Sequence, residues 1–180
     1  SEERYEEMIA ELFVRFPSFQ KVGAGAYKPG IATMEFADQL MGHPHKKYDI
    51  IHVAGTNGKG SVSNMLTSVL AASGKKVGLY TSPHITDFRE RMRVVTSSQL
   101  ELVSKEYVWD FVHKWQETFD HLDMSFFEIT TLMALNWFAD MGVDVVVLET
   151  GLGGRLDSTN IVTPVLSVIT NIGLDHCDML

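Results

Sequence analysis

The feature that most constrains the fold is a short stretch that passes from apolar residues into a glycine-rich loop. The segment IIHVAGTNGKGS covers residues 50–61 and holds three glycines, one lysine and one serine after an apolar run. The usual phosphate-loop pattern G-x-x-x-x-G-K-[ST] fits only in part, because Val53 replaces the first glycine and Gly60 separates Lys59 from Ser61. A plain strand-to-helix turn also needs glycine, but three glycines around a lysine favour a site for nucleotide phosphate.

Four apolar runs predict parallel strands of one sheet. The runs are YDIIHVA (48–54), KKVGLYTS (75–82), VDVVVLET (143–150) and PVLSVITNIG (164–173). The last two are rich in β-branched residues, which is typical of strands that are buried on both faces of a parallel sheet. The first two runs, with the loop and a helix between them, form a βαβ unit. We therefore expect them to be parallel neighbours joined by a right-handed crossover.

Helical periodicity predicts helices between and around these strands. An amphipathic helix is expected over residues 3–14 and a short helix over residues 32–41. The helix after the glycine loop, residues 60–73, should bury one apolar face. The residues that form this face at helical spacing are Val62, Met65, Leu66, Val69 and Leu70.

Two serine–glutamate pairs have the spacing of a capping box and predict two further helices. Ser98 and Glu101 would open a helix that runs to about residue 119, and Ser125 and Glu128 would open the next one. Strands and helices then alternate along the chain. We therefore expect an α/β fold in which helices flank a mostly parallel sheet.

The composition excludes several classes of protein. The 180 residues suit one domain, and 45% hydrophobic residues suffice for a core. A net charge of -8 and a pI near 5.3 argue against a surface for nucleic acid or anionic membranes. The single cysteine, Cys177, excludes an internal disulfide and favours a reducing compartment. The acidic N-terminus differs from a signal peptide and no apolar run reaches 18 residues, so we expect a cytoplasmic protein.

The glycine loop has the chemistry of a polyphosphate site. Gly55, Gly58 and Gly60 allow positive φ angles and carry no Cβ, so successive backbone N–H groups can converge on phosphate oxygens. Lys59 supplies a mobile positive charge for the β- and γ-phosphates. Ser61, in the first turn of the predicted helix, could turn its hydroxyl to Mg²⁺.

Polar residues also stand at the ends of two other predicted strands, and ligands of α/β sheets gather at that edge. Glu149 ends one strand, precedes a second glycine-rich loop, and could hold Mg²⁺ directly or through water. Asp175 and His176 follow the next strand, from which either could reach the metal region. A lone histidine in such a place is more often structural.

The segment after the second predicted strand carries polar and basic residues. Pro83 fixes a turn that presents Ser82 and His84, although an ordinary turn has the same pattern. Alternating arginines follow, and in an extended segment they would face one way, either as an anion-facing row or as a solvated edge. These are Arg89, Arg91 and Arg93.

Two aromatic residues open the last predicted helix. Phe126 and Phe127 could stack on a flat ring, although residues that open an apolar helix more often belong to the core. Glu128, which follows them, is most simply the acid of the capping box.

Five ordered segments together resemble a known family. The segments are HVAGTNGKGS, TSPHITDFRERMRV, SFFEITTLMAL, VVVLETGLGGRLDSTN and LSVITNIGLDH. They resemble the N-terminal ATPase domain of folylpolyglutamate synthase and of its bifunctional relative with dihydrofolate synthase activity, which belong to the Mur ligase superfamily. The resemblance covers about residues 20–180 and implies the P-loop NTPase-like fold of a Mur ligase central domain.

The resemblance implies an ATP-dependent ligase that uses Mg²⁺ to join L-glutamate to dihydropteroate or folate. The substrate carboxylate takes the γ-phosphoryl group of ATP, and the amine of glutamate attacks the resulting acyl phosphate. Phosphoryl transfer needs charge neutralisation and in-line positioning, which agrees with the chemistry of the loop.

The resemblance also assigns residues to these steps. Lys59 and His176 would take part in catalysis, and the magnesium ligands would be Ser61, Glu149 and His176. The ATP loop would comprise Gly55, Thr56, Asn57, Gly58, Lys59, Gly60 and Ser61. The residues at the folate site would be Ser82, Pro83, His84, Phe88, Arg89, Arg91, Phe126, Phe127 and Glu128.

Two parts of the family pattern lie outside the chain. The family usually has a carbamylated lysine downstream of the LDH motif and a C-terminal domain that binds glutamate. We therefore expect residues 1–180 to be the N-terminal ATP-binding domain of a longer parent, and to be inactive alone.

Two alternative functions stay open. The first is a Mur-type ligase for a nucleotide-sugar peptide or a cyanophycin-like polymer, and the second is a nucleotide-dependent switch without ligase activity. The sequence indicates neither the oligomeric state nor which of the two folate reactions applies.

Overall fold

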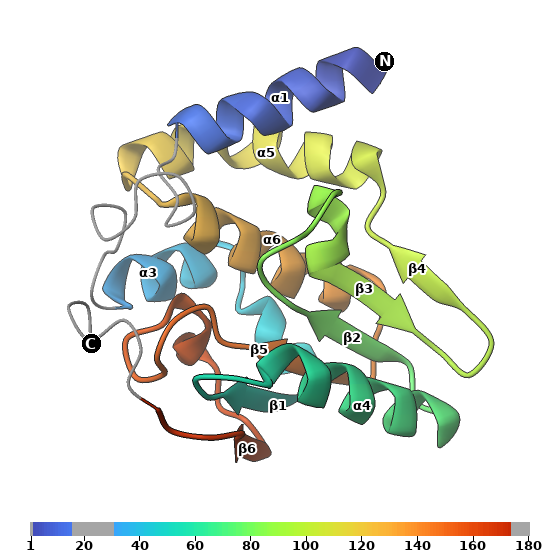
Figure 1. Ribbon diagram of the computed structural model, residues 1–180. Coiled ribbons are helices and arrows are strands. Elements are labelled where there is room, and N and C mark those ends of the chain that lie inside the picture. The colour runs from blue at the N-terminus through green and yellow to red at the C-terminus, as the bar shows by residue number, and fades with distance from the viewer. Residues whose placement is uncertain (1, 16–30, 174–180) are drawn as a thin grey trace.

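The computed structural model describes residues 2–15 and 31–173, which form a six-stranded sheet flanked by helices (Figure 1). The sheet has the order β4-β3-β2-β5-β1-β6. The strands are β1 (Asp49–Ala54), β2 (Val77–Tyr80), β3 (Met92–Val95), β4 (Leu100–Leu102), β5 (Val145–Glu149) and β6 (Leu166–Ile169). The helices are α1 (Glu2–Arg15), α3 (Ala32–Leu40), α4 (Lys59–Ala72), α5 (Lys105–His121) and α6 (Phe126–Asp140). Three short 3-10 helices are η2 (Pro44–Lys47), η3 (Phe88–Arg91) and η4 (Ser158–Ile161).

The four predicted strands are parallel, as expected, and this confirms the mostly parallel α/β fold. β1 pairs with β5 and β6, and β2 pairs with β5. The prediction that β1 and β2 are neighbours is wrong, because β5 lies between them. Val145 pairs with Asp49 on one side and with Val77 on the other. Every residue of β5 is buried, so the later and more apolar strand takes the central position. β3 and β4 extend the sheet with antiparallel pairing.

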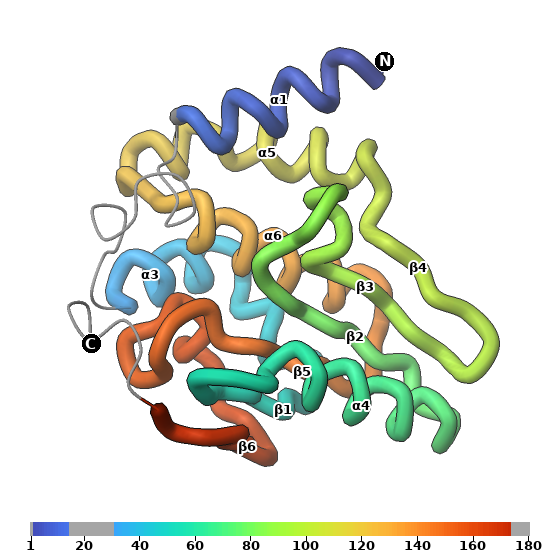
Figure 2. The backbone as a smooth tube through the Cα atoms, viewed as in Figure 1, coloured from blue at the N-terminus to red at the C-terminus, as the bar shows by residue number. Residues whose placement is uncertain are grey.

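Helices cover the two faces of the sheet, and the faces follow the alternation of side chains along each strand. In β1, Ile51 and Val53 belong to the apolar cluster against which Leu66 of α4 packs. Ile50 belongs instead to the larger cluster that contains the buried residues of α6, such as Leu132. α5 packs on α6 and α1 on α5, so a second helical layer lies outside the first (Figure 2).

The buried face of α4 differs from the predicted one. Ser63, Thr67 and Ala71, four residues apart, are its most buried positions. Met65 and Val69, which were expected in the buried face, are 60% and 69% exposed. Small side chains allow the helix to lie close to the sheet, and this close contact turns part of the apolar stripe outward.

One of the two predicted capping boxes forms. The Ser125 hydroxyl accepts a hydrogen bond from the N–H of Glu128, and the Glu128 carboxylate accepts one from the N–H of Ser125, so the box at the start of α6 is confirmed. The box at Ser98 and Glu101 is wrong, because Glu101 lies in β4, paired with β3. α5 starts later, with Ser104 as its N-cap. Pairing with a neighbouring strand outweighs the local capping signal there.

β6 differs from a strand buried on both faces. Leu166 is 50% exposed and Ile169 is 64% exposed. In the described part of the chain β6 pairs only with β1 and forms an edge of the sheet. An apolar, β-branched run alone does not distinguish a central strand from such an edge.

Substitution of Gly78 in β2 tests how closely α6 packs on the sheet. A Cβ at this position would lie 2.7 Å from Cδ1 of Phe138 in α6. We expect Gly78→Ala to lower the free energy of unfolding by about 1–3 kcal/mol, because the added methyl overpacks the core. Urea unfolding of the chain measures the change. Gly154→Ala is the control, since a Cβ there meets open space. Equal stability of the two variants would contradict the expectation.

Candidate phosphate-binding site

The glycine loop joins β1 to α4 and has the backbone of an anion-binding turn. Gly58 is the N-cap of α4 and lies in the left-handed region, with φ 81°. Gly55 has φ 140°, and a Cβ there would lie 2.0 Å from Oγ1 of Thr170. Both positions therefore require glycine. The N–H of Val62 donates the first bond of the helix to the Gly58 carbonyl, so the N–H groups before it have no partner within the helix and can serve an anion.

The segment that follows β6 holds this loop in position. The N–H of Thr56 donates to the carbonyl of Asn171, and the N–H of Asn57 donates to its side-chain oxygen at 2.8 Å. In return, the Thr170 hydroxyl donates to the carbonyl of Asn57 at 2.6 Å. We did not expect a role for Thr170 and Asn171 from the sequence. They fix the loop before any ligand binds, which lowers the cost of organising the site.

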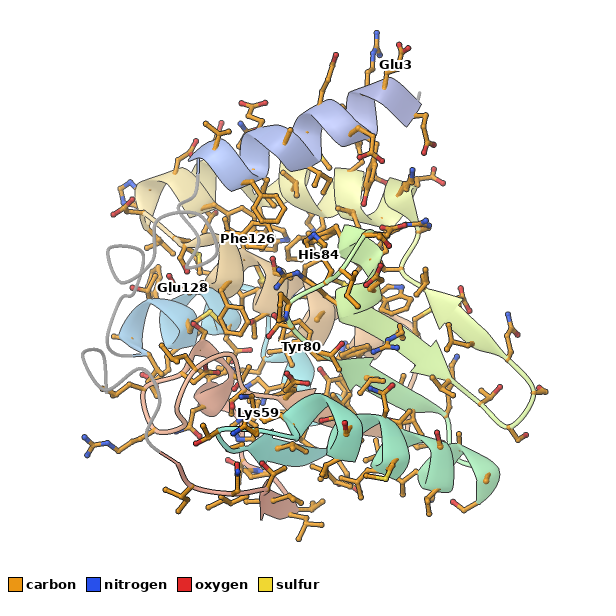
Figure 3. The ribbon with its side chains drawn as sticks, viewed as in Figure 1. Glu3, Lys59, Tyr80, His84, Phe126 and Glu128 are labelled. Atoms are coloured by element: carbon orange, nitrogen blue, oxygen red, sulfur yellow. The ribbon has the colours of Figure 1, made fainter. Side chains whose placement is uncertain are left out.

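Lys59 begins α4 and reaches back across the glycine loop. Its Nζ donates to the carbonyl of Gly55 at 2.8 Å. Figure 3 shows the side chain at the amino end of α4, on the side where the loop and the end of the sheet meet. The ammonium group is thus held at the mouth of the loop, where it would face a bound phosphate.

A cavity of about 320 Å³ opens beside the loop, at the carboxyl ends of β1, β5 and β6. This volume falls within the range of small-molecule sites. Five of its lining residues are glycines, which leave backbone atoms accessible, and Lys59 brings a positive charge. The lining residues are Ala54, Gly55, Thr56, Lys59, Gly151, Leu152, Gly153, Gly154, Ile169, Asn171, Ile172 and Gly173. The cavity therefore lies at the sheet edge where the sequence predicts a ligand.

Glu149 ends β5 as a buried carboxylate next to the first turn of α4. The residue is only 3% exposed, and its Oε2 accepts no hydrogen bond within the described residues. Burial raises the pKa of this carboxyl to about 7, although the charges of Lys59 and Arg93 and a hydrogen bond from the N–H of Ser82 act in the opposite direction. A Cβ at Gly60 would lie 3.7 Å from Oε2, so the carboxylate faces the start of α4. A buried acid oxygen that lacks a donor fits a cation.

Of the other two predicted metal ligands, one lies within the described residues and the other does not. Ser61 is exposed and follows Gly60 in the first turn of α4, so its hydroxyl belongs to the same helix end that Glu149 faces. His176 lies outside the described residues, and so does Asp175. A hydroxyl and a carboxylate oxygen are the hard ligands that Mg²⁺ takes beside phosphate and water, so the described part of the donor set fits this ion.

The second glycine-rich loop, after β5, is organised by Asp157. Its buried carboxylate accepts hydrogen bonds from the N–H groups of Gly151 and Leu152 at 3.0 and 2.8 Å, and from the N–H and hydroxyl of Thr159. Burial raises the pKa of Asp157 above its usual range, and these hydrogen bonds offset only part of the shift. Sequence reasoning missed this residue. The signal is an aspartate followed two positions later by threonine, which is typical of turns in which a side chain binds nearby backbone N–H groups.

The predicted folate segment after β2 forms a mixed aromatic and basic cluster. Arg91 is 3% exposed, its Nε donates to Nδ1 of His84 at 2.7 Å, and its guanidinium lies 5.1 Å from the Phe126 ring centre. Burial and the charge of Arg91 lower the pKa of His84, which favours the neutral imidazole. Phe126 is 1% exposed and stacks on Phe13 of α1 at 4.0 Å. Figure 3 shows His84 and Phe126 above Tyr80.

The remaining predicted folate residues are dispersed around this cluster. Phe88 is buried, Ser82 is half-buried and Pro83 is exposed. The ring of Phe127 packs against Gly151, where a Cβ would lie 2.5 Å away. Glu128 is buried as the capping acid of α6, as predicted.

The predicted single row of arginines is wrong. Arg89 and Arg91 lie in η3, and only Arg93 lies in the extended strand β3. Arg89 pairs with Asp87 through two nitrogens, while Arg93 donates to the hydroxyl of Thr81 at 3.0 Å. Asp87 caps η3 and forms a capping box that starts a helical turn, so the segment does not keep the alternation of an extended chain.

Comparison with known proteins agrees with this arrangement. Residues 53–180 match the model of the Mur ligase middle domain. The chain belongs to the Mur ligase family. It is 42% identical, over 85% of its length, to a dihydrofolate synthase/folylpolyglutamate synthase of Bacillus subtilis, of which the match spans 36%. This Mur ligase domain therefore spans about two fifths or less of the length of the relatives that it matches.

Two solved structures have the same fold as this Mur ligase domain. Escherichia coli FolC in complex with DHPP and ADP superposes with a TM-score of 0.84 and 34% identity, over 98% of this chain and 40% of FolC. A bifunctional folylpolyglutamate synthase/dihydrofolate synthase with Mn, AMPPNP and L-glutamate bound gives a TM-score of 0.74 and 38% identity, over 83% of this chain and 36% of the other. Among the described residues, no helix of the domain is long and apolar enough to cross a membrane.

Proposed function

We propose that this domain binds ATP for a ligase that joins L-glutamate to dihydropteroate, to folate, or to both. The observation that carries the proposal is the buried carboxylate of Glu149 beside a preformed phosphate loop that is closed by Lys59. The similarity to dihydrofolate and folylpolyglutamate synthases supports this choice of substrates. ATP chemistry and a single cysteine both fit a cytoplasmic enzyme.

In this proposal each element of the site has a defined task. The N–H groups at the start of α4 bind the phosphates, and Lys59 neutralises charge on the β- and γ-phosphates. Ser61, Glu149 and His176 would hold Mg²⁺, which when bound spreads the charge of the phosphoryl group in transfer. The loop after β5, which Asp157 holds in position, lines the cavity together with the glycine loop.

The reaction would proceed in two displacement steps. An oxygen of the substrate carboxylate attacks the γ-phosphorus of ATP, and ADP leaves. The amine of glutamate then attacks the acyl phosphate carbon, inorganic phosphate leaves, and the amine loses its proton. Neither step requires a covalent bond to the protein, so the residues act by positioning and by charge.

ADP release by the ligase that contains this domain tests the proposal. The substrates are dihydropteroate, folate and a UDP-muramyl peptide, each with and without L-glutamate. We expect ADP formation that depends on glutamate and on one or both pterin substrates. Activity only with the UDP-muramyl peptide would assign another Mur-type ligase, and nucleotide binding without any amide product would assign a switch.

The isolated chain provides a second test. We expect residues 1–180 alone to show no glutamate-dependent ATP hydrolysis. The expectation follows from the share of the relatives that the domain spans. Measurable turnover by the isolated chain, above that of a Lys59→Ala variant prepared in the same way, would contradict it.

A further inference from the structure

A second group of ligand-type side chains lies away from the phosphate loop, where α3 ends and η2 begins. Oδ2 of Asp38 is 2.5 Å from Nδ1 of His43 and 3.0 Å from Nε2 of His45. Asp38 and His45 are buried, with 3% and 7% exposure, while the His43 side chain is 41% exposed. The three ligand atoms all lie within 4.8 Å of one another. Neither the predicted reaction nor the phosphate site uses these residues.

The backbone turns sharply in order to bring the two histidines together. Gly42 has φ 77° and His43 has φ 54°, so two consecutive residues are left-handed, which is uncommon for a residue other than glycine. The N–H of His43 donates to the carbonyl of Asp38 at 2.9 Å and returns the chain over the last turn of α3. Pro44 then opens η2, which places His45 on the same carboxylate. Backbone strain of this kind is retained where the surrounding structure holds a site together.

The carboxylate of Asp38 is prepared to act as a ligand. Its Oδ2 lies within hydrogen-bonding distance of both imidazoles. Its second oxygen, Oδ1, is buried and accepts no hydrogen bond within the described residues. A hydrogen-bonded cap would require only Oδ2. An additional acceptor atom, buried without a donor, indicates that the cluster serves a further partner.

We propose that Asp38, His43 and His45 form a binding site for a zinc-type divalent metal ion, separate from the nucleotide site. Two imidazoles and one carboxylate suit Zn²⁺ or Co²⁺ rather than Mg²⁺, which prefers oxygen ligands. Tetrahedral bonds of about 2.0–2.2 Å place the ligand atoms about 3.4 Å apart. To reach this spacing, Nδ1 of His43 would move away from Oδ2 of Asp38, from which it is now 2.5 Å. The exposed side of His43 leaves a path of entry and a fourth position for water.

The position of the site gives it a structural role. η2 leads directly into the amino end of β1, whereas the phosphate loop leaves the carboxyl end of this six-residue strand, about 17 Å away. η2 also packs against α6, and the Tyr48 hydroxyl donates to the carbonyl of Leu135 in that helix. A bound metal ion would therefore fasten the end of α3 to the segment that anchors β1. It stabilises the domain without contacting the nucleotide.

Metal titration of the chain tests this inference. Metals are first removed with a chelator. Binding of Zn²⁺ is then measured by titration calorimetry and binding of Co²⁺ by visible absorption, both in the presence of excess Mg²⁺. We expect one site that gives an intense tetrahedral Co²⁺ band and raises the melting temperature. His45→Gln and His43→Gln, which retain size and polarity, should each weaken Zn²⁺ binding about 100-fold or more. Circular dichroism confirms that each variant folds.

Control variants separate this site from other donors in the chain. His113 and His121 are exposed, and a double variant in which both are replaced by alanine should bind Zn²⁺ as the parent does. The double variant His176→Ala, Cys177→Ser should also retain the site, which excludes binding near the end of the chain. Absence of a one-to-one Zn²⁺ complex, or binding that His45→Gln leaves unchanged, would overturn the proposal and leave the cluster as a hydrogen-bonded cap.

Discussion

Replacing Lys59 by alanine is expected to lower the rate of ADP formation by about 10³-fold in the ligase that contains this domain. The Lys59 ammonium is held over the glycine loop by the carbonyl of Gly55 and lines the cavity in which the phosphates are proposed to lie. Charge develops on the transferred phosphoryl group, and a positive group fixed beside it stabilises the transition state more than the ground state. The rate constant should therefore fall further than nucleotide affinity does.

Lys75→Ala is the matched control for this variant. Lys75 is exposed beyond the opposite end of α4 and contacts neither loop of the cavity, so its removal should leave the rate within twofold of the parent. Thermal unfolding shows whether both variants fold. A Lys59→Ala enzyme with more than a tenth of the parental rate would contradict the role assigned to this lysine.

The second large effect concerns Glu149 and the dependence of stability on pH. In the metal-free chain burial raises the pKa of this carboxyl from 4.5 to about 7. Between these values the folded chain binds a proton that the unfolded chain releases, so stability falls as the pH rises through this window. Above pH 7 the loss amounts to about 3 kcal/mol. We expect Glu149→Gln, which carries no charge, to be more stable than the parent by up to this amount at pH 8.

Urea unfolding at pH 5 and pH 8 measures this difference, because the effects of other titrating groups cancel between the two proteins. The gain should be close to zero at the lower pH. Mg²⁺ with an ATP analogue should reverse the order at pH 8, since the parent retains its carboxylate ligand and the variant does not. A gain of the same size at both pH values would show that the carboxyl does not titrate in this window.

Much of the site could be predicted because its signals are local. The glycines of the loop, the lysine after them and the capping box at Ser125 act within a few residues. The structure confirms the box and gives Gly55 and Gly58 positive φ angles, whereas Gly60 lies in α4 without one. Glu149 is a candidate from the sequence because it ends an apolar run, and the structure places it at the end of β5, where strand ends meet at one edge of the sheet. The roles of Thr170, Asn171 and Asp157 were missed, since each holds a loop through hydrogen bonds to the backbone of other residues.

The α/β class, the parallel strands and the strand–loop–helix unit follow from the amino-acid sequence alone, because periodicity and turn chemistry act over a few residues. The place of β5 between β1 and β2, and the position of β6 at an exposed edge of the sheet that the described residues form, become visible only in the folded domain. The same holds for the side of α4 that meets the sheet and for the burial of Arg91 against Phe126. These features depend on contacts between segments far apart in the chain, where the burial of apolar surface outweighs local preference.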